Sequence, residues 1–150
     1  MNSLRRTTGR KRKPLAEVCQ NWHNVAMKRK PLFWVGSSKD DLRAFPEEVK
    51  DVMGHALDIA QQGGKAVSAR PLSGFGGAGV FEIVDDFDGN TYRAVYTVQL
   101  ADAVYVLHAF QKKSKKGIAT PKPVLDLIRS RLKLAREHHS EWRRASGETP

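Results

Sequence analysis

The amino-acid sequence predicts a small α+β domain, with a curved, mostly antiparallel sheet and helices packed on one face. Short runs rich in aromatic and β-branched residues indicate strands, and two segments repeat apolar residues at the helical spacings of three and four. Their order along the chain is strand, helix, helix, three strands, helix. The chain has 150 residues, of which 40% are hydrophobic, and this suits one domain with its own core.

The first strand and the first helical region occupy residues 31–64. The segment "PLFWVG" at residues 31–36 has strand composition, and residues 37–64 follow a helical pattern. Its apolar stripe consists of Leu42, Phe45, Val49, Val52, Ala56 and Ile59. Pro46 is expected to divide this helix in two, because proline inside a helix removes a backbone hydrogen bond. Gly63 and Gly64 are expected to end it.

Three strands are then expected to form an antiparallel meander. They are "GVFEIV", "TYRAVYTV" and "AVYVLHAF", joined through a turn at Asp88-Gly89 and the short link "QLAD". The glycine-rich "SGFGGAG" before them lacks the ending of a phosphate-binding loop and indicates a flexible entry to the hairpin. A basic helix follows, with Thr120 as N-cap and Pro121 at the first helical position. Its apolar stripe consists of Val124, Leu125, Ile128, Leu132 and Ala135.

Charge divides the chain into an acidic middle and two basic ends, for a net charge of +10. Residues 1–30 carry nine Lys/Arg and one acidic residue, residues 31–110 carry six and eleven, and residues 111–150 carry eleven and four. This asymmetry favours nucleic acid or another polyanion as partner over a basic tail that only aids solubility. No apolar run approaches the roughly 20 residues of a membrane span. A single cysteine, Cys19, excludes a disulfide within one chain and favours a reducing cytoplasm.

Three regions are expected along the chain. Residues 1–30 lack a sustained apolar period and are expected to be a mostly disordered basic arm, in which Leu15–Ala26 is a candidate short helix and Met27 an alternative start. Residues 31–137 form the folded domain, and residues 138–150 a polar tail. His138 and His139 are adjacent on a helix and point about 100° apart, so they are expected to be surface residues and not a metal pair.

Two charged residues and one histidine lie inside the expected strands. Arg93 and Glu82 each share a strand face with apolar neighbours, and a charge is costly to bury unpaired. Either the two form a structural ion pair, or Arg93 faces an open anion-binding surface and Glu82 accepts a proton. His108 alternates with Val104, Val106 and Phe110, which indicates a core histidine.

Four lysines follow the last strand within five residues, at Lys112, Lys113, Lys115 and Lys116. Ammonium groups this close repel one another, and a bound anion relieves the repulsion. A loop held by a rigid sheet is a usual place for binding groups. These lysines therefore indicate a phosphodiester site, with a solvated loop as the alternative.

Parts of the sequence resemble the RelE/HigB-like toxins of bacterial type II toxin–antitoxin systems, from about Pro31 to Ala135. The segments that carry the resemblance are "PLSGFGGAGVFEI", "NTYRAVYTV" and "VYVLHAFQKKSKKGIATPKPVLDLIRSRL". The similarity is closest to the phage-derived branch, whose mark is a strand ending in His-x-Phe-x-Lys-Lys followed by Thr-Pro and a helix. The resemblance implies a small RelE-like domain.

The resemblance also implies a function. Such toxins are metal-independent endoribonucleases without a cofactor, which cleave messenger RNA on the ribosome and inhibit translation. The implied partners of this cytoplasmic protein are messenger RNA, the ribosome and a helix-turn-helix antitoxin encoded by a neighbouring gene, with no membrane partner.

Roles for individual residues follow from the resemblance. Arg93 matches the strand arginine that contacts the scissile phosphate in the family, and basic residues follow the last long strand there too. Glu82 or His108 is then the candidate base. The expected catalytic residues are Arg93, Lys112, Lys113, Glu82 and His108, and the expected RNA-binding residues are Arg70, Lys115 and Lys116. No tyrosine in the last helix matches the family's C-terminal catalytic tyrosine, so a non-catalytic nucleic-acid- or ribosome-binding protein and an inactive toxin relic remain alternatives.

Overall fold

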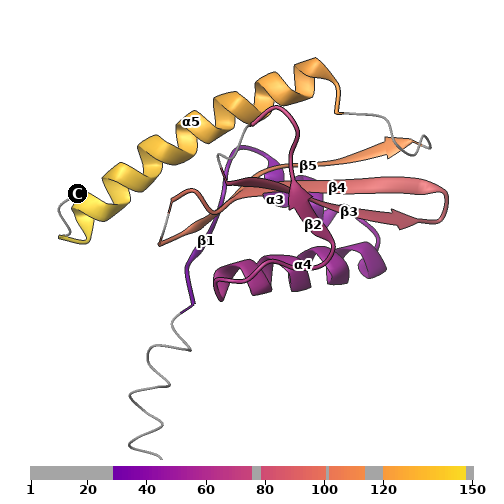
Figure 1. Cartoon of the computed structure of the whole chain (residues 1–150), viewed down its shortest axis with the longest axis horizontal. Coiled ribbons are helices and arrows are strands. Elements are labelled where there is room, and N and C mark those ends of the chain that lie inside the picture. The colour runs from indigo at the N-terminus through magenta and orange to yellow at the C-terminus, as the bar shows by residue number, and fades with distance from the viewer. Residues whose placement is uncertain (1–28, 76–78, 101, 114–119, 148–150) are drawn as a thin grey trace, which may run out of the picture.

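The computed structural model describes residues 29–75, 79–100, 102–113 and 120–147 (Figure 1). It contains the expected order of elements and one additional short strand. The elements are β1 (Leu32–Trp34), α3 (Ser38–Arg43), α4 (Glu47–Gln61), β2 (Ala69–Pro71), β3 (Val80–Phe87), β4 (Asn90–Thr97), β5 (Val104–Lys113) and α5 (Lys122–Ala145).

The strands form one open, five-stranded sheet in the order β1-β5-β4-β3-β2. Strands β3, β4 and β5 are the expected antiparallel meander, and β2 adds an antiparallel edge beside β3. Strand β1 pairs in parallel with β5 at the opposite edge. The sequence analysis did not predict β2, since three residues that include a proline carry no strand period.

Helices cover both faces of this sheet, which corrects the expectation that they pack on one face; the α+β class itself is confirmed. Helix α4 and α3 pack on one face, and α5 packs on the other (Figure 1). The reason is that the central strands are apolar on both sides. Tyr96 and Val106 join the core under α4, whereas Val95 and Tyr105 join the core under α5. These sides are called the α4 face and the α5 face below.

The expected break at Pro46 is confirmed. Pro46 precedes the first residue of α4 as its N-cap, and Glu47 and Glu48 lie in the first turn, where acidic side chains are favourable. Helix α4 buries Val49 and Met53 completely. The two helices on either side of Pro46 therefore pack their apolar residues into the same core.

Helix α5 is longer than the sequence analysis expected. It continues through Ala145, so most of the expected polar tail, residues 138–150, is helical. His139 is buried and pairs with Asp102, while Trp142 packs beside the core of the α5 face. The expectation that His138 and His139 are both plain surface residues was wrong for the buried His139, since an Asp102 carboxylate satisfies its ring.

The basic arm expected at residues 1–30 lies outside the described residues, except for its end. The candidate helix Leu15–Ala26 and Met27 also lie there. Arg29 pairs with Asp58, and the backbone N–H of Lys30 donates to the carbonyl of Gln61 at 2.9 Å, so the chain enters β1 along the end of α4. In the part of the chain that the structure describes, none of the helices combines the length and the apolar character needed to cross a membrane.

A β-bulge in β5 changes which side chains face α5. Val95 lies opposite His108, but the next residue, Tyr96, lies opposite Val106, so Leu107 is an extra residue in β5. Before the bulge, Val106 belongs to the α4 face. After it, His108 lies opposite Val95 on the α5 face. Strict alternation placed His108 with Val106, and this was wrong because one inserted residue reverses the faces.

We predict that two substitutions in α5 differ sharply in cost, because Ile128 is fully buried and Leu134 is 53% exposed. Ile128→Ala should lower the free energy of unfolding by about 2–5 kcal/mol, and Leu134→Ala by less than about 1 kcal/mol. Denaturant unfolding of both variants measures the difference. Equal costs would contradict the docking of this face of α5.

Candidate functional site

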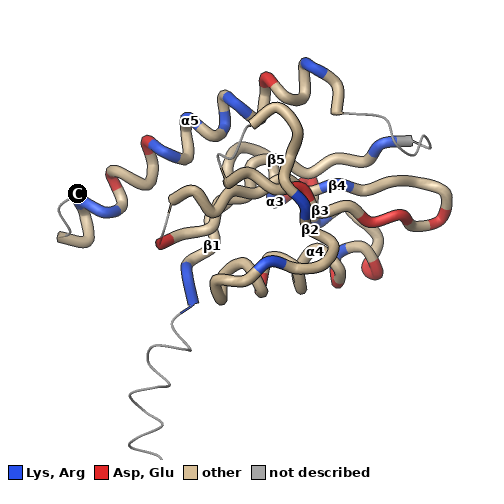
Figure 2. The backbone as a smooth tube through the Cα atoms, viewed as in Figure 1, with Lys and Arg blue, Asp and Glu red and all other residues tan. Residues whose placement is uncertain are grey.

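A row of charged side chains crosses the α5 face. Arg70 of β2 lies opposite Glu82 of β3, and Lys112 of β5 lies two pairs beyond the pair that contains Arg93 of β4. In Figure 2, basic positions accordingly mark β2, β4 and the end of β5, with an acidic position among them. Four neighbouring strands therefore bring together three cations and one carboxylate that are far apart in the sequence.

A buried ion pair lies at the centre of this row. Arg93 Nη1 donates to Glu82 Oε1 at 2.7 Å, and the side chains of Arg93 and Glu82 are only 5% and 7% exposed. Arg70, which is 58% exposed, donates from Nε to the other carboxylate oxygen at 3.2 Å. Both oxygens of Glu82 therefore accept hydrogen bonds from guanidinium groups. Of the two alternatives left open by the sequence, the structure favours the ion pair.

This geometry changes what Arg93 and Glu82 can do. The guanidinium of Arg93 lies beneath other side chains instead of at an open surface, and its Nε atom is buried without a hydrogen-bond partner among the described residues. The expected direct contact between Arg93 and a phosphate is not available in this arrangement. Glu82 is equally poorly placed to take a proton from a bound hydroxyl, because it is buried and doubly paired.

Lys112 is the residue in the row with the properties of a proton-transfer group. It is partly exposed, and burial together with the nearby positive charge of Arg93 holds its pKa below the ordinary value of 10.5, while Glu82 acts in the opposite direction. A lowered pKa makes an ammonium group a better proton donor near neutral pH. The buried pair thus influences a group that solvent can reach.

His108 lies on the same face as Lys112, four residues earlier in β5. Its Nδ1 atom is 3.2 Å from Nη1 of Arg131 in α5, and its ring stacks on Phe110 with centroids 5.0 Å apart. Burial and the Arg131 charge lower the pKa of His108 below 6.5, against the opposing effect of Asp41. The ring is partly exposed, so the expectation of a core histidine was wrong.

The remaining expected site residues are only partly described. Lys113 ends β5 with its backbone opposite Asn90. The side chain of Lys113, and the whole of Lys115 and Lys116, lie outside the described residues. The turn between β3 and β4 lies at the same end of the sheet as Lys113. The end of β3 that leads into this turn is acidic (Figure 2). There, Asp86 accepts a hydrogen bond from Thr91 at 2.7 Å.

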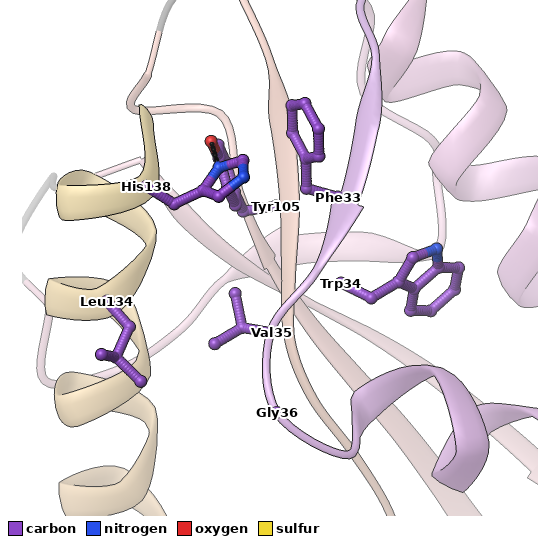
Figure 3. Close-up of a pocket in the computed structure, with 7 residues that line it drawn as sticks. All are labelled: Phe33, Trp34, Val35, Gly36, Tyr105, Leu134 and His138. Carbon is purple, nitrogen blue, oxygen red and sulfur yellow. Dashed lines mark hydrogen bonds between the residues drawn. The ribbon is translucent and has the colours of Figure 1, made fainter. Parts of the chain in front are cut away.

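Sequence reasoning missed Arg131, which links α5 to β5. The only sequence signal is a basic residue on the margin of the apolar stripe of α5, and that pattern does not indicate a partner. Sequence reasoning also missed a cleft of about 240 Å³ between α5 and β1. Figure 3 shows Phe33, Tyr105, Leu134 and His138 around this cleft, where the Tyr105 hydroxyl and His138 Nδ1 are 2.7 Å apart.

This cleft is separate from the charged row. Tyr105 and Lys112 are seven residues apart on β5, or roughly 23 Å at about 3.3 Å per residue. Among the described residues, no group of three or more His, Cys, Asp or Glu side chains is arranged to hold a metal ion. The charged row is therefore the better candidate site for a polyanion.

Comparison with known proteins gives a family match. A model of the family described as "Phage derived protein Gp49-like (DUF891)" matches residues 40–133, which include β2 to β5 and the first half of α5. No curated protein matches the chain. No solved structure matches it. The matched region contains every member of the charged row.

We predict strong coupling between Arg93 and Glu82 in the free energy of unfolding. Arg93→Met should cost about 3 kcal/mol, because it leaves the buried carboxylate with Arg70 alone, and Glu82→Leu should cost about 3–5 kcal/mol. The double variant should be much more stable than the two costs added together, since it removes both buried charges.

The exposed pair Lys122–Asp126, 3.0 Å apart, is the matched control, for which we expect a much smaller coupling because solvent screens both charges. Denaturant unfolding of both double-mutant cycles measures the couplings. Additive costs for Arg93 and Glu82 would contradict the buried ion pair.

Proposed function

Because the chain belongs to the Gp49-like family of phage-derived proteins, a family associated with toxin–antitoxin systems, we propose that it is a RelE/HigB-type toxin that cleaves messenger RNA on the ribosome. The single observation that supports this best is the charged row on the α5 face. It combines an exposed cation at Arg70 with Lys112, a partly exposed lysine whose pKa is lowered.

The proposed reaction is attack of an RNA 2′-hydroxyl on the adjacent phosphorus, with departure of the 5′-oxygen. The protein must align these atoms, stabilise the additional negative charge on the phosphate and supply a proton to the leaving oxygen, while the proton of the attacking 2′-hydroxyl passes to solvent water. Because charge on the phosphate must be stabilised and a proton supplied at the same bond, the reaction requires cations and a proton donor close together. Amino-acid side chains can provide both.

The residues of the row divide these tasks. Lys112 donates the proton to the departing 5′-oxygen, and Arg70 binds a phosphate with a guanidinium that is already fixed on one side by Glu82. Arg93 is a positioning residue, because it holds Glu82 in place and lowers the pKa of Lys112 through its charge. Lys113, Lys115 and Lys116 are proposed to bind the RNA backbone on either side of the cleaved bond.

The proposed partners follow from the same assignment. A helix-turn-helix antitoxin encoded by a neighbouring gene would keep the toxin inactive. The basic ends of the chain suit binding to the RNA-rich ribosome, since residues 111–150 carry eleven basic and four acidic residues.

We predict that Lys112 transfers a proton as well as binding RNA. Lys112→Ala should lower the rate of messenger RNA cleavage on translating ribosomes by about 100-fold or more, the usual contribution of general acid catalysis. Lys112→Arg should lose a similar factor, because a guanidinium keeps the charge but does not release its proton near neutral pH. Primer extension on ribosome-bound messenger RNA measures the cleavage.

Lys133→Ala, at an exposed lysine of α5, is the control and should cleave as the wild type does. A Lys112→Arg variant with wild-type activity would limit Lys112 to phosphate binding. If the wild-type protein binds ribosomes and cuts no messenger RNA, it is a non-catalytic binder and the proposed activity is wrong.

The pH dependence of cleavage should show the same group. A general acid must be protonated, so the single-turnover rate should fall as pH rises through the pKa of Lys112, which lies below 10.5. Arg93→Gln removes a cation and should move the inflection to higher pH. Glu82→Gln removes an anion and should move it to lower pH. Shifts in the same direction for both variants would contradict this electrostatic arrangement.

A further inference from the structure

The guanidinium of Arg131 is built into the junction between α5 and β5. Nη1 donates to the carbonyl of Leu107, the extra residue of the bulge, at 2.9 Å, and Nη2 donates to the hydroxyl of Ser37 at 3.3 Å. Gly36 makes room for the group, because a Cβ atom there would lie 2.8 Å from Cζ of Arg131. Gly36 also has a φ of 58°, which favours glycine. The position of this arginine is therefore fixed by β5 and by the connection between β1 and α3.

Arg131 determines which nitrogen of His108 carries the proton. Its Nη1 atom lies 3.2 Å from Nδ1 of His108. A guanidinium has only donors and stays protonated, so Nδ1 must accept this hydrogen bond. A neutral imidazole has one proton, and here it must be on Nε2. No hydrogen bond joins Nε2 to another described residue, and the ring is partly exposed.

We propose that Arg131 is a positioning residue that presents His108 as a neutral Nε2–H donor, and that this donor reads the edge of an RNA base next to the cleaved phosphate. The inference rests on the proposed ribonuclease function and adds a residue that determines its cleavage-site preference. A base is the better ligand than a phosphate, because the donor is uncharged and its ring stacks on Phe110. Single-stranded RNA bases are commonly bound by aromatic stacking together with hydrogen bonds to their edges.

Burial and the charge of Arg131 both favour this neutral state of His108. The charged groups that face the ring are Arg131 from α5 and Asp41 from α3, and the cationic one prevails together with burial, so the pKa lies below 6.5. His108 therefore stays neutral when pH falls to values at which an exposed histidine becomes protonated. With its proton on Nε2 and its Nδ1 occupied, His108 is a hydrogen-bond donor and not the base that the resemblance suggested.

Nuclear magnetic resonance of ¹⁵N-labelled histidine tests the positioning directly on the whole protein without RNA. We expect the wild-type His108 signals to be those of the Nε2–H form, with a pKa below 6.5. Arg131→Gln keeps a donor but removes the charge, so it should keep the Nε2–H form and raise the pKa. Arg131→Met should raise the pKa and allow both proton positions. The control, Arg136→Met, removes an exposed arginine that bonds Gln99 and should change neither.

Mapping of messenger RNA cleavage sites tests base reading. His108→Ala and Arg131→Met should reduce the preference among sites by about three- to tenfold, the effect of losing one hydrogen bond. A wild-type Nδ1–H form, or an unchanged site preference in a His108→Ala variant that still cleaves, would overturn the inference and leave the ribonuclease proposal intact.

If the wild type cuts nothing, the ribonuclease proposal fails. A shift of the Nε2–H signal on adding a 2′-O-methyl RNA would then support base binding, and no shift would overturn it.

Discussion

The ion pair between Glu82 and Arg93 is the interaction on which the rest of the α5 face depends. Two charges in the middle of a sheet, each less than a tenth exposed, are tolerated only when they are paired with good geometry. Their pairing requires that β3 and β4 keep one register, because a shift of one residue would turn one of the charges to the α4 face. The pair therefore requires one strand register, and its two charges also influence the pKa of Lys112, which solvent can reach.

Two further features connect this pair to the helix above it. The bulge in β5 places His108, Phe110 and Lys112 on the α5 face, and it offers the carbonyl of Leu107 to Arg131. The β2–β3 connection is held to α5 as well, since Arg129 lies over the ring of Phe75 at 5.1 Å and donates to the carbonyl of Gly74. Helix α5 is therefore fixed to both sides of the charged row. A polymer bound there would contact a rigid surface.

Much of the fold follows from the sequence, whereas the site does so only in part. Periodicity and turn residues were sufficient for the meander, the break at Pro46 and the helix that begins near Thr120, since these depend on local chemistry. The second helical layer was missed because apolar runs in β4 and β5 do not say which face is covered. The face of His108 depends on one inserted residue, and the extension of α5 depends on Asp102, which is distant in sequence. Both alternatives for Arg93 were visible in the sequence, but only the register of β3 against β4 decides between them.

We propose that RNA binds on the α5 face, over the charged row that the buried pair organises. The most direct test is a titration of the ¹⁵N-labelled protein with a short 2′-O-methyl RNA, followed through the backbone amide signals. If RNA binds there, we expect the largest changes at Arg70, at Lys112 and along the β5 residues after the bulge, and we expect these changes to weaken with increasing salt. Changes concentrated on α4, or in the cleft between α5 and β1, with the charged row unaffected, would contradict it.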